Sequence, residues 1–303
     1  MPDIMVRFLA LLLLPTLLAG CVSQREGGLP PQVTLKNVGH EHQALNNCGP
    51  VNAMIVLNYH GHGLTQAQAA QALKDSPYDV EVSTREVADY LETFGLKTLI
   101  RYGGDLNVIR SLLAQELPVI VQQRLEPGDD TAHFRTVYAY SPDGLVASDP
   151  LRGANLRLSN DTFIDLWNYY NGEYLLVYPP EREADVQAAL GRDWEEQTNW
   201  QQLLKKSRTQ TRENPDDAFA WWGQGAAQLA LGQEEKAAQA FDRAVEAGVP
   251  LQYYWYRQEA FEAWNQTGQH QKTLSLTEKV LAQQPGIKEV EFYREAARRL
   301  AAS

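Results

Sequence analysis

The residues that could do chemistry in this 303-residue chain centre on Cys48, one of two cysteines. Gly49 and Pro50 follow it, and proline is favoured at the first position of a helix, where its missing N–H needs no partner. We therefore expect Cys48 just ahead of a helix that begins near Pro50, with Gly49 leaving room for a substrate backbone. A helix N-terminus stabilises the reactive thiolate. Cys48 is thus a candidate nucleophile; the alternative is a small buried hydrophobic residue.

A cysteine nucleophile needs a base that takes its proton and a third group that orients the base. His133 opens one strand-like run, and Asp149 closes the next, after a Pro-Asp-Gly turn that predicts a hairpin. The chain order Cys48, His133, Asp149 therefore supplies the residue types of a thiol-dependent hydrolase site. Gln43, five residues before the cysteine, is a candidate side-chain donor to an oxyanion, with the Cys48 backbone N–H as the second donor.

The register of the hairpin sets a condition on this site. If Tyr140 pairs with Leu145, then Asp149 lies opposite Thr136, three residues from His133. Three residues of strand span about 10 Å. The two side chains therefore meet only if a bulge in the strand, or a bend after the aspartate, brings them together.

The elements that must position these residues change from helices to strands along the first 180 residues. We expect helices near 50–60, 66–73, 84–94, 105–113 and 163–169, and strands near 33–38, 96–102, 118–123, 133–140, 145–149 and 174–178. Ser83 with Glu86 forms a capping-box pattern, and Asp105 is placed as a second helix cap. Helices that come first and strands that dominate later indicate an α+β domain.

Taken together, these motifs resemble the bacteriocin-processing, double-glycine peptidase family, whose fold is papain-like. The resemblance spans about residues 40–178 and rests on Gln43, Asn47-Cys48-Gly49-Pro50, Pro118-Val-Ile-Val, His133-Phe, Val137-Tyr-Ala-Tyr140, Asp143-Gly144 and Ser148-Asp149-Pro150. It implies that Cys48 is the nucleophile, His133 the general base and acid, Asp149 the orienting group and Gln43 the oxyanion donor. It also implies that the fold brings His133 and Asp149 together.

The resemblance does not identify the substrate. Family members borne on transporters carry transmembrane and ATP-binding segments, and this sequence shows neither. A double-glycine leader is therefore one possible substrate among others, and the closer likeness is to stand-alone members on envelope lipoproteins.

The first 20 residues are typical of an export signal. Arg7 supplies positive charge, and the apolar run after it is too short for a transmembrane helix. Leu18-Ala19-Gly20-Cys21 resembles the bacterial lipobox, which implies cleavage before Cys21 and lipid attachment to its thiol. No aspartate follows this cysteine, which in Gram-negative lipoproteins implies the outer membrane, facing the periplasm. Residues 21–31 are predicted to be a tether.

Lipidation of Cys21 would leave Cys48 without a disulfide partner in an oxidising compartment, which favours a function for its thiol. The net charge of −11 makes the chain a poor candidate for nucleic-acid binding, and membrane contact is expected through the acyl group. The pairs His40/His42 and His60/His62 raise a structural-zinc alternative, but nothing indicates a third ligand. We expect no metal and no cofactor.

Helical composition takes over after Pro179-Pro180, and residues 181–303 show a repeat, with Pro215, Pro250 and Pro285 spaced by 35 residues. One unit resembles the tetratricopeptide pattern, in which small residues let two antiparallel helices pack closely; it contains Trp221, Gly225, Gly232, Ala237, Phe241 and Ala244. A second unit, with Trp255, Ala260, Gly268 and Val280, matches less well, and residues 184–214 are a candidate degenerate first unit. Such repeats predict a surface for a peptide or protein partner; the alternative is a helical appendage that only stabilises the chain.

We therefore predict an α+β papain-like cysteine peptidase domain at residues 32–180, followed by an all-α tetratricopeptide-like domain at 181–303. The predicted function is that of a lipid-anchored cysteine peptidase, which cleaves a peptide or protein substrate in the bacterial envelope through a Cys-His-Asp site. The alternative is an envelope scaffold whose peptidase fold is inactive and whose repeats bind partners. Acyl transfer to an amine instead of water would use the same residues.

Overall fold

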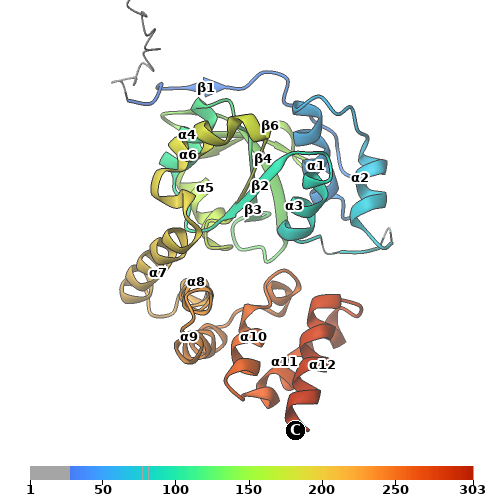
Figure 1. Cartoon of the computed structure of the whole chain (residues 1–303), viewed down its shortest axis with the longest axis vertical. Helices are drawn as coiled ribbons and strands as arrows, with labels where there is room; N and C mark the ends of the chain where they lie inside the picture. Colours follow the sequence, from blue (N-terminus) through green and yellow to red (C-terminus); the bar gives the residue numbers. More distant parts are fainter. Residues whose placement is uncertain (1–27, 77, 81, 303) are drawn as a thin grey trace, which may run out of the picture.

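The computed structural model of the chain describes residues 28–76, 78–80 and 82–302. The predicted signal at 1–20, the lipidation residue Cys21 and most of the tether lie outside these residues. Figure 1 shows two parts, a sheet flanked by helices and, below it, a group of helices that runs to the C-terminus. Among the described helices, none combines the length and the apolar character needed to cross a membrane.

The first part is built on an antiparallel sheet. Its strands are β1 (Val33–Thr34), β2 (Lys97–Arg101), β3 (Val119–Arg124), β4 (Ala132–Ser141), β5 (Gly144–Asp149), β6 (Gly153–Ser159) and β7 (Tyr174–Tyr178). They lie in the order β2-β7-β3-β4-β5-β6, and β1 pairs with the far end of β4. The predicted hairpin is confirmed as β4–β5. Strand β6 was not anticipated from the sequence.

Helices cover both faces of this sheet (Figure 1). One face packs against α1 (Cys48–Tyr59), α2 (Gln66–Leu73) and α3 (Thr84–Glu92), and the other against α4 (Leu106–Ala114), α5 (Asn160–Asn168) and α6 (Glu183–Leu190). The alternation of β3 explains the two layers: Ile120 joins the apolar cluster of α1 and α3, while Val119 and Val121 join that of α4 and α5. The predicted helix caps are confirmed, since Ser83 and Glu86 form a capping box on α3 and Asp105 caps α4.

The second part contains α7 (Glu196–Glu213), α8 (Ala218–Ala230), α9 (Glu234–Glu246), α10 (Glu259–Gln266), α11 (His270–Gln283) and α12 (Lys288–Ala301), with a 3₁₀ turn at Leu251–Trp255. Two further 3₁₀ turns, at Pro180–Arg182 and Gly191–Trp194, flank α6. Helices α8 and α9 span the segment for which the sequence predicts the better-matching repeat unit. A Cβ on Gly225 would lie 2.8 Å from the Phe241 ring, so the absent side chain lets the two helices close on that ring. The second unit departs from the pattern because Leu251–Trp255 is a 3₁₀ turn and α10 is short.

The two parts share a continuous apolar and aromatic contact. Tyr169 and Tyr170, which follow α5, belong to the same buried cluster as Trp222 and Tyr253 of the helical part. The rings of Tyr170 and Tyr253 stack with centroids 5.2 Å apart. Helix α6 joins the first part, since its Val186 and Leu190 lie in the apolar cluster of α4.

Candidate active site

Cys48 is the first residue of α1, two residues earlier than the start expected at Pro50. The preceding Asn47 is the N-cap residue, and its side chain bonds Gln66 instead of capping the helix. Cys48 is partly exposed, and it is the free cysteine among the described residues. The thiol therefore sits at the N-terminus of a twelve-residue helix, where the helix dipole favours a negative charge.

Asn52 fastens this first turn to strand β4. It is fully buried, and its Nδ2 donates to the backbone oxygens of Cys48 (2.8 Å) and Phe134 (2.9 Å). Its Oδ1 accepts from the Thr136 hydroxyl at 2.6 Å. Asn52 was not among the site residues predicted from the sequence. A polar residue in the apolar helix pattern, one turn after a candidate nucleophile, was the available signal.

Gly49 has a different role from the one expected. A Cβ at this position would lie 3.0 Å from Val82 Cγ1, so the space beside Gly49 holds the Val82 side chain and not an approaching substrate. The segment before Cys48 is held by Lys74, whose Nζ donates to Leu45 O at 3.0 Å and to Asn47 Oδ1 at 3.1 Å. These contacts hold the segment between α2 and α3 against the residues on both sides of Cys48.

A β-bulge in β4 brings His133 and Asp149 together. Tyr140 pairs with Leu145 as assumed, but the register shifts between Val137 and Ala139, so the residue between them is extra. After this shift Thr136 pairs with Ser148, which places Asp149 opposite Arg135 instead of Thr136. His133 lies two residues from Arg135 and so on the same face. His133 Nε2 and Asp149 Oδ1 are 2.9 Å apart.

Asp149 is held in one orientation by several donors. Its Oδ1 also accepts the backbone N–H groups of Leu151 (2.7 Å) and Arg152 (2.9 Å), and its Oδ2 accepts Arg135 Nε at 2.7 Å. Arg135 is 1% exposed and Asp149 is fully buried. Arg135 was not among the site residues predicted from the sequence. The signal for it was a charged residue two positions after His133, on the same face of a buried strand.

The electrostatics of the site favour a thiolate–imidazolium pair. Burial raises the pKa of the Cys48 thiol, but the hydrogen bond and positive charge of His133, with backbone N–H groups of Phe134 and Gly49, lower it overall. Burial lowers the pKa of His133, but hydrogen bonds to Asp149 and Cys48 raise it overall. Because Nε2 faces Asp149, Nδ1 is the ring nitrogen left for the sulfur.

The pKa of Asp149 lies well below its ordinary value. Burial acts in the opposite direction and is outweighed by the hydrogen bond and charge of His133, and then by the charge of Arg135. The carboxylate is thus ionised across the ordinary pH range.

Gln43 lies near the turn that follows Asp149. Its backbone N–H donates to Pro150 O at 3.0 Å, which joins the segment before Cys48 to the end of β5. Its side-chain Oε1 is buried and has no hydrogen-bond partner in the described part of the chain. No described contact joins this side chain to Cys48, so its oxyanion role stays a prediction.

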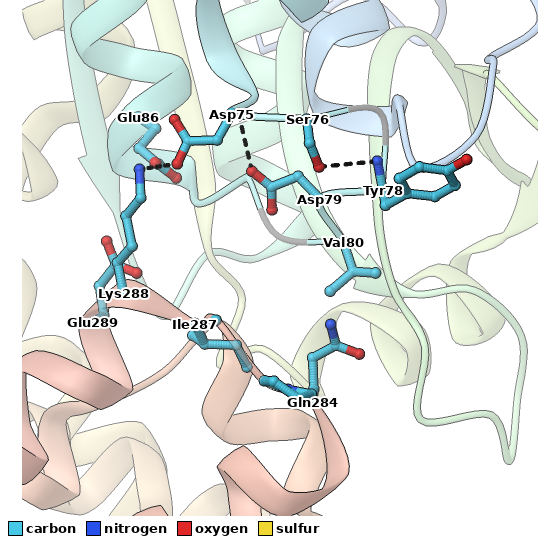
Figure 2. Close-up of a pocket in the computed structure, with 12 residues that line it drawn as sticks. Asp75, Ser76, Tyr78, Asp79, Val80, Glu86, Gln284, Ile287, Lys288 and Glu289 are labelled. Atoms are coloured by element: carbon cyan, nitrogen blue, oxygen red, sulfur yellow. Dashed lines mark hydrogen bonds and ion pairs between the residues drawn. The ribbon is translucent and has the colours of Figure 1, made fainter.

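Two cavities lie near this region. The larger, about 710 Å³, reaches Asn47, the neighbour of Cys48, and is lined by Glu41, Leu45, Gln66, Ala70 and Lys74 among others. The smaller, about 300 Å³, lies between the segment after α2 and the start of α12 (Figure 2). In it, Lys288 of α12 pairs with Asp75. Cys48, His133 and Asp149 are not among the residues that line either cavity.

The histidine pairs do not gather into a larger ligand set. The rings of His40 and His42 meet edge to face, with centroids 4.8 Å apart. His40 Nδ1 lies 3.0 Å from the Ser148 hydroxyl. Within residues 28–76, 78–80 and 82–302, no group of three or more His, Cys, Asp or Glu side chains is arranged to hold a metal ion.

Three solved structures illustrate what the chain is similar to. The peptidase domain of Streptococcus ComA, a bifunctional ABC transporter involved in a quorum-sensing pathway, is 19% identical and covers 46% of this chain and 96% of its own, with a TM-score of 0.39. A putative C39-like peptidase from Bacillus anthracis is 13% identical and covers 48% and 96%, with a TM-score of 0.43. A double-glycine-motif protease from an AMS/PCAT transporter, in complex with the leader peptide, is 17% identical and covers 49% and 98%, with a TM-score of 0.37.

The comparison with curated proteins gave no match. The comparison with family models gave one, to the Peptidase_C39 like family, over residues 30–175. This match and the architecture confirm the predicted fold class, an α+β papain-like cysteine peptidase domain followed by an all-α part. They also confirm the resemblance on which the sequence analysis relied. Residues 30–175 of this chain are therefore similar to the Peptidase_C39 like family.

Proposed function

We propose that this protein is a lipid-anchored cysteine peptidase that cleaves a peptide or protein substrate in the bacterial envelope. The observation that carries the proposal is the chain of contacts from Cys48 through His133 to Asp149, at the N-terminus of α1. The residue types, their order and the directions of their pKa shifts are those that nucleophilic thiol catalysis requires.

In the proposed reaction the Cys48 thiolate attacks the carbonyl carbon of the scissile peptide bond, and the carbonyl electrons move to its oxygen. The Cys48 backbone N–H and the Gln43 side-chain amide stabilise this oxyanion. The tetrahedral intermediate collapses, the C–N bond breaks, and His133 gives its proton to the leaving amine. A thioester on Cys48 remains.

In the second half, His133 takes a proton from water as the water attacks the thioester carbonyl. The C–S bond breaks, the carboxylic acid leaves, and the thiolate–imidazolium pair is restored. Asp149 keeps the His133 ring oriented through both halves. An amine in place of this water would give acyl transfer with the same residues.

The cavity of about 710 Å³ beside Asn47 suits the substrate chain next to the scissile bond. Its lining combines apolar groups, such as Leu45 and Ala70, with Lys74 and Glu41 at its polar parts. We assign recruitment of the substrate, or of a protein partner, to the helical part. We assign membrane attachment to a lipid on Cys21, with the outer membrane as the site.

The central test is cysteine-dependent cleavage. The full chain is incubated with a library of peptides from envelope proteins, and new peptide termini are detected by mass spectrometry. We expect products that are absent with Cys48→Ala and with His133→Ala. Products that persist with Cys48→Ala would refute the mechanism. The absence of any product, together with an unreactive thiol, would favour the scaffold alternative.

The anchor is tested separately in cells. Metabolic labelling with a fatty acid is expected to mark the wild-type chain and not a Cys21→Ser variant. Fractionation is expected to place the labelled chain with the outer membrane. A labelled Cys21→Ser variant would overturn the lipidation site, and recovery in the inner membrane would overturn the sorting.

A further inference from the structure

Arg135 is an arginine inside the peptidase domain whose guanidinium donates four hydrogen bonds to fixed groups. Its Nε donates to Asp149 Oδ2 at 2.7 Å, and its Nη1 donates to Gln123 Oε1 at 3.0 Å. Nη1 and Nη2 also donate to the backbone oxygens of Arg124 and Leu125, at 3.2 and 2.7 Å. Because two of these acceptors are backbone atoms at the end of β3, the guanidinium plane is fixed by the sheet.

The position of this guanidinium decides how the Asp149 carboxylate points. Oδ1 receives His133 Nε2 and two backbone N–H groups, while Oδ2 receives Arg135. With both oxygens held, the carboxylate plane has one orientation, and that orientation directs Oδ1 to the imidazole. If Arg135 were absent, Oδ2 would be a buried charged oxygen without this donor, and the carboxylate would be free to turn.

Arg135 also completes a charge balance. A thiolate on Cys48 and a proton on His133 cancel, and Asp149 would add an uncompensated negative charge beside them. Arg135 supplies the matching positive charge at 1% exposure, where solvent screens little. Two further charged or titratable groups act on the cluster from outside it, Lys74 on Cys48 and His40 on Asp149.

We propose that Arg135 is a positioning residue of this site, which locks the Asp149 carboxylate toward His133 and neutralises its charge so that the Cys48 thiolate is retained. It acts through Asp149 and touches no reacting atom. The inference rests on the proposed function, because it assigns Arg135 a part in the reactivity of Cys48.

The test follows alkylation of Cys48 by iodoacetamide against pH in the full chain, with mass spectrometry of the peptide that contains this cysteine. Removing the cation leaves a net negative charge beside the sulfur, so Arg135→Met is expected to raise the thiol pKa. A rise of one unit lowers the thiolate fraction about tenfold below the pKa. Arg135→Lys keeps the charge and loses the planar fork, so we expect a change below about threefold in thiolate fraction, with slower peptide cleavage.

Arg101 is the matched control. It is a buried arginine on β2, 7% exposed, whose Nε donates to the backbone oxygen of Asp193 at 2.7 Å, with no described contact to the site. Arg101→Met should cost stability without moving the alkylation profile of Cys48. Thermal unfolding of each variant separates loss of fold from loss of reactivity.

If Arg135→Met does not fold, the double variant Asp149→Asn with Arg135→Met removes both charges and restores the balance. It is compared with Asp149→Asn alone. In that single variant Arg135 has no counter-charge, so we expect the pKa of Cys48 to be lower there than in the double variant. A reactive wild-type thiol whose profile is the same in all Arg135 variants overturns the role of Arg135 alone. A wild-type thiol that titrates as ordinary cysteine overturns the proposed function and this inference together.

Discussion

At the residue scale, the site is a row of four ionisable side chains that are arranged in two pairs. Cys48 and His133 form the first pair, and Asp149 and Arg135 the second, with the bond of His133 to Asp149 joining them. Each pair is electrically neutral when ionised. His133, Asp149 and Arg135 are buried and Cys48 is partly exposed, so the alternating charges replace the solvation that the buried groups lose on folding.

The first prediction concerns the pH dependence of Cys48. The pKa of Cys48 is lowered and that of His133 is raised, and both shifts favour the thiolate–imidazolium pair. Peptide cleavage should fall at low pH as the thiolate gains a proton, and at high pH as the imidazolium loses the proton needed by the leaving amine. The measurement is the rate of cleavage and of alkylation against pH.

In His133→Ala the thiol is expected to titrate near the value of free cysteine, about 8.5. An alkylation profile that this substitution leaves unchanged would mean that the two residues are not coupled. His62→Ala, on an exposed residue near the end of α1, is the control and should leave the profile as in wild type.

The second prediction concerns stability. Asp149→Asn leaves Arg135 buried without its counter-charge, which is expected to cost about 3–5 kcal/mol at neutral pH. Since the folded-state pKa of Asp149 is depressed, this stability is present above the ordinary aspartate pKa and is lost as the pH falls below about 4. Urea unfolding at several pH values should therefore show that the difference in the free energy of unfolding between wild type and variant decreases in acid.

Asp165→Asn serves as the comparison for this experiment. Asp165 pairs with Arg124 at 2.7 Å and is 53% exposed, so its loss should cost less than about 1 kcal/mol. Equal effects of the two substitutions would contradict the assigned role of the buried pair.

At the element scale, the site depends on how one helix and two strands are joined. Asn52 ties the first turn of α1 to β4, and the bulge in β4 turns Asp149 toward the face of His133. A hairpin without the bulge would place Asp149 opposite Thr136, whose hydroxyl faces Asn52 and the α1 side. The contact between histidine and aspartate is thus a property of the strand pairing.

The third prediction follows from this join. Asn52→Leu keeps the side-chain size but leaves the Phe134 carbonyl and the Thr136 hydroxyl without their partner, which should cost at least about 2 kcal/mol. Cys48 should also lose reactivity, because the start of α1 is no longer held beside His133. The measurements are urea unfolding and alkylation of Cys48.

Asn58→Ala on the same helix is the control. Asn58 is exposed and bonds both backbone groups of Leu64, so its loss should cost about 1 kcal/mol and leave alkylation as in wild type. Alkylation of Cys48 at the wild-type rate in Asn52→Leu would show that other contacts position the start of α1.

At the scale of the whole molecule, the helical part is packed firmly against the peptidase domain. Arg257, 3% exposed, pairs with Glu173 of the peptidase domain at 3.2 Å and with Glu259 at 2.8 Å. Tyr256 donates its hydroxyl to the backbone oxygen of Val80, two residues from the Val82 that packs on Gly49. The helical part therefore contacts the segment whose Val82 packs beside Gly49, the residue after Cys48.

The fourth prediction tests this packing. Arg257→Met leaves Glu173 buried without a cation and should destabilise the full chain by about 3–5 kcal/mol. Arg298→Met, in an exposed pair with Glu295, should change stability by less than about 1 kcal/mol. Thermal and urea unfolding report both. We expect a single unfolding transition, whose midpoint falls in Arg257→Met. A separate, earlier transition of the helices alone would show that the two parts unfold independently.

The sequence by itself determined the parts of this protein that depend on neighbouring residues. The capping box of Ser83 and Glu86, the turn between β4 and β5, and the switch from strands to helices are local patterns. The grouping of Cys48, His133 and Asp149 came from their types and from the resemblance to a family. These features are readable because propensity and turn chemistry act over a few residues.

Only the tertiary structure decided which of these residues meet. The bulge at Tyr138 leaves no clear mark in an alternating strand, yet it changes the face on which Asp149 lies. Arg135 and Asn52 gain their partners from strands and helices that are distant in the chain, and Gly49 is required by Val82 rather than by a substrate. Register and the pairing of buried charges depend on long-range packing, and a single extra residue in a strand reverses the face of every side chain beyond it.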